Sequence, residues 1–140
     1  MGAMRFVAGC AALAFASAAV AADKPCTKAD AAAAEKALDR VVSWGQLNTA
    51  WRDFRHCDKD AIGELYTDAL LRLIVQWKDI ETAAAAMQKD AQYRDFVYAH
   101  LKTPAAKDDL EAVYSRTKSN CPAGLEAFCA ELAGVVKPPS

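Results

Sequence analysis

The sequence predicts a small all-α protein: an orthogonal bundle, or a short stack of helical pairs, with about seven helices stapled by disulfides. Three observations support this fold class. Ala, Leu, Glu, Lys and Asp are abundant, whereas β-branched runs and alternating apolar patterns are nearly absent. Apolar residues recur at spacings of three and four between short polar breaks. Four cysteines follow a segment that is typical of an export signal.

That segment, residues 1–22, has the composition of a Sec-type signal peptide. Arg5 supplies one positive charge, residues 6–20 are apolar, and small residues lead up to Ala22. We therefore expect cleavage near Ala22 and a periplasmic or secreted product. By length, residues 23–136 form a single helical domain, and residues 137–140 are expected to be a disordered tail.

The first two predicted helices form a hairpin. The first covers residues 28–42, and Thr27 is its N-cap, with Asp30 completing a variant of the capping box. Ser43 helps to break this run, and the second helix covers residues 46–56. The short connection between them favours an antiparallel pair.

The third helix is expected to be the central element. Asp58 is its predicted N-cap. From Ile62 to Trp77, apolar residues recur every three or four positions and form a broad stripe. A helix this apolar should be covered on more than one side.

Start signals predict four further helices. They cover residues 80–89 after Asp79, 91–101 after Asp90, 108–117 after Thr103-Pro104, and a last segment that begins at Cys121-Pro122.

The four cysteines are expected to be structural. Cys26 precedes the first helix and Cys57 follows the second, so a hairpin brings both to one end and favours this pair. Cys121 and Cys129 then pair by elimination. A continuous helix would hold their Cα atoms about 12 Å apart, so this pair requires a turn at residues 122–124. The alternative links the last helix to the first hairpin, by pairing Cys26 with Cys121 and Cys57 with Cys129, or the reverse.

Composition excludes several classes of function. The formal net charge is −1, and no basic stripe indicates nucleic-acid binding. No apolar run of spanning length follows the leader, so stable membrane insertion is not expected. Hydrolase, phosphate-binding and haem-attachment motifs are absent from the sequence. We therefore expect a protein that is not an enzyme and uses no cofactor.

The two histidines, His56 and His100, match no zinc spacing. His56 is interpreted as a helix-end or surface residue, and His100 as a residue at a helix C-terminus, where positive charge is favourable. We therefore expect no metal site.

Two aromatic residues suggest a surface for a partner. Trp44 and Tyr98 lie off the main apolar stripes of their helices. An exposed aromatic pair on a rigid scaffold would form a partner-binding patch. The alternative, that both pack against neighbouring helices, stays open.

Part of the chain resembles small exported proteins of Gram-negative bacteria. The segments that carry this likeness are Cys57-Asp58-Lys59-Asp60, Phe96-Val97-Tyr98-Ala99-His100 and Cys121-Pro122-Ala123-Gly124. They imply no activity. The size, helicity and cysteine usage are also similar to those of periplasmic immunity proteins of contact-dependent toxin systems, although no motif is shared.

The expected function is therefore a non-catalytic protein-binding module with a protein partner in the cell envelope. One alternative is an immunity or inhibitor protein against a cell-wall-degrading toxin. The other is a small ligand carrier or enzyme with a pocket between helices. A binder should show an exposed apolar patch and no deep cleft, whereas a carrier should show an internal cavity lined by aromatic residues.

Overall fold

The computed structural model describes residues 24–139, so the predicted signal peptide lies outside the described residues. Within them the chain forms seven α-helices and two short 3₁₀ helices, with no strand. This confirms the predicted all-α fold class. The elements are α1 (Lys28–Leu38), α2 (Trp44–Phe54), η1 (Arg55–Cys57), α3 (Asp60–Gln76), α4 (Ile80–Lys89), α5 (Ala91–Leu101), η2 (Pro104–Ala106), α6 (Lys107–Ser119) and α7 (Glu126–Val136).

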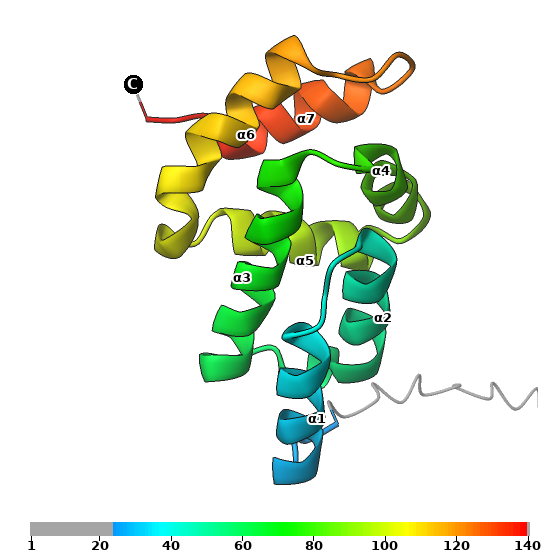
Figure 1. Ribbon diagram of the computed structural model, residues 1–140, viewed down its shortest axis with the longest axis vertical. Helices are drawn as coiled ribbons and strands as arrows, with labels where there is room; N and C mark the ends of the chain where they lie inside the picture. Colours follow the sequence, from blue (N-terminus) through cyan, green and yellow to red (C-terminus); the bar gives the residue numbers. More distant parts are fainter. Residues whose placement is uncertain (1–23, 140) are drawn as a thin grey trace, which may run out of the picture.

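Helix α3 is the centre of the bundle, as its apolar stripe predicts. It contacts α1, α2, α5 and α6, while α1 with α2, α4 with α5, and α6 with α7 form sequential pairs. Figure 1 shows α5 crossing α3, with the α6–α7 hairpin at one end of the molecule and α1 at the other. The lower half of α3 therefore lies next to the α1–α2 hairpin, and its upper half next to α6.

Aromatic side chains from three helices form the middle of the core. The Trp51 and Tyr93 rings, and likewise the Tyr66 and Phe96 rings, have centroids 5.2 Å apart. The Tyr66 hydroxyl donates a 2.9 Å hydrogen bond to the Ala50 carbonyl oxygen, so the only polar atom of this buried side chain is satisfied. These contacts fix α5 against both α2 and α3.

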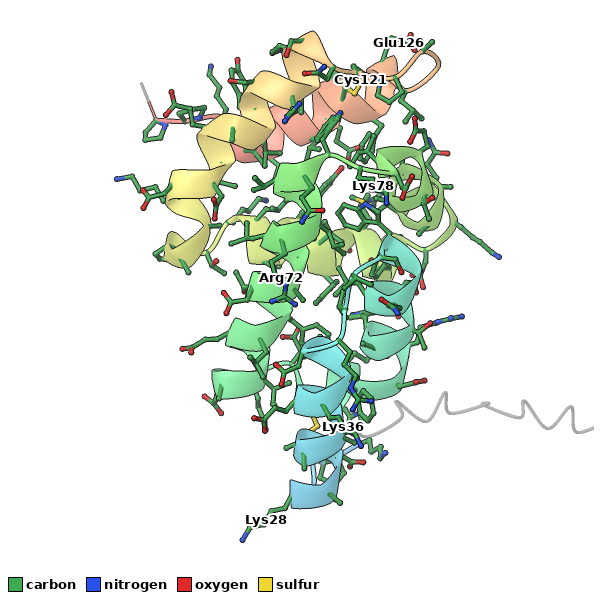
Figure 2. All side chains as sticks on the ribbon, in the orientation of Figure 1. Lys28, Lys36, Arg72, Lys78, Cys121 and Glu126 are labelled. Carbon is green, nitrogen blue, oxygen red and sulfur yellow. A yellow bond between two sulfur atoms is a disulfide. The ribbon has the colours of Figure 1, made fainter. Side chains whose placement is uncertain are left out.

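The boundary between α1 and α2 differs from the prediction. Helix α1 ends at Leu38, and α2 begins at Trp44, because the Ser43 side chain accepts a hydrogen bond from the Gln46 N–H and acts as the N-cap. Arg72 of α3 donates to the Leu38 carbonyl oxygen at 3.2 Å and so satisfies the end of α1. Figure 2 shows the Arg72 side chain between α3 and the end of α1.

Both preferred disulfides are confirmed. Cys26 and Cys57 have Cα atoms 4.9 Å apart, and Cys121 and Cys129 have Cα atoms 6.1 Å apart. The second pair is possible because α7 begins at Glu126 and not at Cys121-Pro122. Gly124, at φ +86°, forms the turn that precedes the helix. Cys121 lies at this end of the α6–α7 hairpin in Figure 2.

The predicted capping box of α1 is present, and it is extended by a histidine. The Asp30 N–H donates to the Thr27 hydroxyl oxygen at 3.0 Å, and the Thr27 N–H donates to the Asp30 carboxylate at 3.3 Å. His56 Nε2 lies 3.3 Å from the same carboxylate. Contacts with the Thr27 side chain, the Thr27 N–H and then the imidazole lower the pKa of Asp30 to about 2.

This low pKa predicts how stability responds to acid. Because the folded pKa lies below the unfolded value, the stability due to the Asp30 carboxylate is complete above about pH 4. It is lost as pH falls towards about 2. Urea unfolding of the wild type and Asp30→Asn should therefore give stabilities that differ at neutral pH and converge in acid. A difference that stays constant over this range would contradict the assignment.

Candidate functional site

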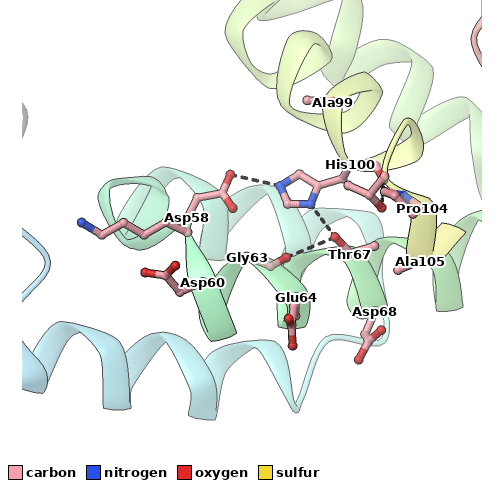
Figure 3. Close-up of a pocket in the computed structure, with 12 residues that line it drawn as sticks. Asp58, Asp60, Gly63, Glu64, Thr67, Asp68, Ala99, His100, Pro104 and Ala105 are labelled. Carbon is pink, nitrogen blue, oxygen red and sulfur yellow. Dashed lines mark hydrogen bonds and ion pairs between the residues drawn. The ribbon is translucent and has the colours of Figure 1, made fainter.

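The candidate site is an open cleft between the first half of α3 and the junction of α5 with η2. Its volume is about 550 Å³. Figure 3 shows α3 forming one wall, with residues at the end of α5 and in η2 opposite. The lining residues are Asp58, Lys59, Asp60, Gly63, Glu64, Thr67, Asp68, Ala99, His100, Thr103, Pro104 and Ala105.

A chain of three polar side chains joins the two walls. His100 Nε2 lies 3.0 Å from Asp58 Oδ2, and His100 Nδ1 lies 2.7 Å from Thr67 Oγ1. His100 and Thr67 are 9% and 4% exposed, so this network is largely removed from water. Figure 3 shows the imidazole lying between the carboxylate and the hydroxyl. Buried polar groups need such partners, and the network holds α5 against the start of α3.

The hydrogens in this network have two arrangements. Thr67 Oγ1 also lies 3.1 Å from the Gly63 carbonyl oxygen, to which it donates. In that arrangement the Nδ1–H donates to the Thr67 oxygen. In the other, the Thr67 hydroxyl donates to Nδ1. In both arrangements the Asp58 carboxylate accepts from the Nε2–H, because a carboxylate has no proton to donate.

The role predicted for Asp58 is wrong. Lys59 occupies the N-cap position of α3, and no side chain caps this helix. The Asp58 carboxylate is instead bound to His100. Asp60, the first helical residue, has a φ of +49°, a conformation that aspartate tolerates better than most residues. The Asp58 carboxylate, which the sequence pattern assigns to the N-terminus of α3, therefore binds the His100 imidazole instead.

A stripe of three carboxylates lines one edge of the cleft. Asp60, Glu64 and Asp68 follow each other at four-residue spacing on α3, and all three are exposed. None of them forms an ion pair within residues 24–139. Lys59 and His100 are the basic residues of the lining. The cleft thus presents uncompensated negative charge, which attracts a cationic group.

The spacing of these acids suits an extended cation better than a single ion. One helical turn separates each carboxylate from the next, a rise of about 6 Å. Within the described part of the chain, no group of three or more His, Cys, Asp or Glu residues is placed to hold a metal ion.

The predicted aromatic patch at Trp44 and Tyr98 is wrong, because both side chains are buried, at 3% and 9% exposure. The Trp44 indole N–H donates to the Lys78 carbonyl oxygen at 3.0 Å, which ties α2 to the turn before α4. Burial, together with the nearby Glu131 carboxylate, raises the pKa of Tyr98 to about 12. Both residues pack against neighbouring helices, the alternative left open by the sequence.

The sequence pattern singled out neither Thr67 nor the contacts of His100. A signal was present for both. Thr67 lies three and four residues before Leu70 and Leu71, and His100 lies three and four residues after Val97 and Phe96. A polar residue inside an apolar stripe indicates a buried hydrogen-bonding group. The identity of its partner, across 33 positions of sequence, could not be read in this way.

Comparison with other proteins adds no functional assignment: no family model matches the chain, and neither the curated proteins nor the solved structures contain a significant match. In residues 24–139 no helix combines the length and apolar character that crossing a membrane requires.

Proposed function

We propose that this chain is an exported, non-catalytic protein-binding module, and that its cleft holds a basic segment of a protein in the cell envelope. The observation that supports this function is the stripe of Asp60, Glu64 and Asp68 along an open cleft. Among residues 24–139 the strongly exposed large apolar side chain is Val42. Recognition through charge therefore has more support than recognition through an apolar patch.

The wall opposite the acids suits the side chain of lysine or arginine. Ala99, Pro104 and Ala105 present small, exposed apolar groups there. The methylene stem of a basic side chain can lie along such groups while its charged end reaches Glu64 or Asp68. A partner segment with successive basic residues would pair with successive carboxylates.

The Asp58–His100–Thr67 chain contains the residue types of a catalytic triad, but its geometry favours a structural role. The Thr67 hydroxyl is buried in α3 and already bonded to Gly63, so a substrate carbonyl cannot approach it without local opening. The lining contains no Trp, Tyr or Phe among the described residues, so an aromatic-lined carrier pocket has no support here. A rigid network that sets the width of the cleft fits the binding role.

Two features support export. The composition of residues 1–22 is typical of a signal peptide, and the two disulfides are suited to an oxidising compartment. An immunity or inhibitor protein is the specific form of this function in which the basic segment belongs to a cell-wall-degrading toxin.

The test is a comparison of cleft variants in capture experiments. The purified protein should retain a defined set of proteins from a periplasmic fraction, and Glu64→Gln/Asp68→Asn should lose them. The matched control Glu35→Gln/Glu111→Gln, on exposed positions of α1 and α6, should retain them. Equal capture by all three proteins would contradict the role of the cleft. A captured cell-wall hydrolase that the protein inhibits would identify the immunity form.

A further inference from the structure

We infer that a second groove, next to the cleft, binds an acidic stretch of the same partner polypeptide. This groove measures about 880 Å³. It is lined by Lys24, Arg52, Arg55, His56 and Lys59, with Asp53 as its acidic residue, and by Pro25, Cys26, Trp51 and Gln92. Its balance of charge is therefore opposite to that of the cleft. The inference rests on the proposed function, because it specifies the charge pattern of the partner.

Arg52, Arg55 and Lys59 are the cations of the groove that can receive oxyanions, because Lys24 and His56 already face the Asp30 carboxylate. The Arg55 guanidinium lies 5.1 Å from the centroid of the Trp51 ring and donates to Gln92 Oε1 at 2.9 Å. This planar group is thus held in place before any ligand binds, which suits paired hydrogen bonds to a carboxylate. Arg52 and Lys59 are exposed and form no ion pair within residues 24–139.

A half-buried histidine also lines this groove. His56 Nε2 is shielded from solvent and lies 3.3 Å from the Asp30 carboxylate, which also pairs with Lys24 at 3.6 Å. The disulfide ties Cys26, which lines the groove, to Cys57, the residue that follows His56. The disulfide therefore constrains the backbone that carries the basic side chains of the groove.

The position of the groove favours a polypeptide over other anions. Lys59 lines both the groove and the cleft, so the basic surface passes directly into the stripe of Asp60, Glu64 and Asp68. A long uniform polyanion, such as a nucleic acid or an anionic membrane, would meet this stripe and be repelled. A polypeptide with an acidic stretch beside a basic one matches both surfaces at once.

Calorimetric titration of the intact, disulfide-bonded protein with synthetic peptides tests this inference. We expect oligoglutamate to bind at low salt and to bind less at about 0.3 M salt. Arg52→Gln/Arg55→Gln should weaken oligoglutamate binding about tenfold and leave oligolysine binding unchanged. The matched control Lys107→Gln/Arg116→Gln, on exposed positions of α6, should bind oligoglutamate like the wild type. A peptide that joins an oligoglutamate segment to an oligolysine segment should bind at least about tenfold more tightly than either segment alone.

The outcomes separate the groove from the cleft. Absence of oligoglutamate binding, or equal binding by the Arg52/Arg55 variant and the wild type, would overturn the inference. Tighter binding of duplex DNA or of phosphatidylglycerol vesicles than of oligoglutamate would overturn the choice of a polypeptide. If oligolysine alone fails to bind, the proposed role of the cleft is contradicted. The groove is still supported in that case, provided that the wild type binds oligoglutamate and the Arg52/Arg55 variant does not.

Discussion

Replacing Cys26 and Cys57 with alanine is expected to lower the free energy of unfolding by about 3–4 kcal/mol. These residues are 31 positions apart, and opening their disulfide frees a loop of that size in the unfolded chain. Cys121 and Cys129 are only 8 positions apart, so the matched replacement there should cost less, about 2–3 kcal/mol. Alanine is preferred to serine because Cys57 and Cys129 are buried.

The measurement is denaturant unfolding of the wild type and both double variants under the same oxidising conditions. The first disulfide should also matter for binding, because Cys57 lies between His56 of the groove and Asp58 of the cleft. Loss of the Cys26–Cys57 disulfide should therefore weaken the binding of both oligolysine and oligoglutamate. Loss of the Cys121–Cys129 disulfide should leave the binding of both peptides unchanged. The reverse order of stabilities would show that the loop-entropy account does not apply to this fold.

Local signals in the sequence predicted much of this fold. The Thr27–Asp30 capping box and the Asp90 cap depend on groups within three residues, and both form where expected. The apolar spacing along α3 is also a local signal. It predicted the central place of this helix, since a helix that is apolar on more than one side can be buried only in the middle of a bundle. The turn at Gly124 followed from the distance limit on a disulfide.

Interactions between distant segments could not be predicted in this way. Asp58 looks like an N-cap because that is the commonest use of an aspartate before an apolar helix, but a histidine 42 positions away binds it. Trp44 lies off the stripe of its own helix, and its buried indole N–H donates to a carbonyl group 34 positions away. Four of the five basic residues of the groove lie between Arg52 and Lys59, but the groove itself forms only when the folded hairpin brings Lys24 beside them.

Replacing His100 with leucine is expected to lower the free energy of unfolding by about 2–3 kcal/mol. Leucine fills the space of the ring but removes both hydrogen bonds, so the Asp58 carboxylate loses its donor and the Thr67 hydroxyl keeps only Gly63. Leaving a partly buried charged acceptor without a partner costs more than a neutral hydrogen bond contributes. Thr67→Val should therefore cost less, about 1 kcal/mol, because the carboxylate keeps its imidazole.

Two further variants separate the hydrogen bonds from simple packing. His100→Gln supplies an amide donor to Asp58 and should retain more stability than the leucine variant of similar size. In a double-mutant cycle, His100→Leu should cost less in an Asp58→Asn background, because the orphaned carboxylate is absent there. Stability measured by urea unfolding gives this coupling directly. Additive costs would mean that Asp58 and His100 do not stabilise each other, and that packing alone holds α5 against the start of α3.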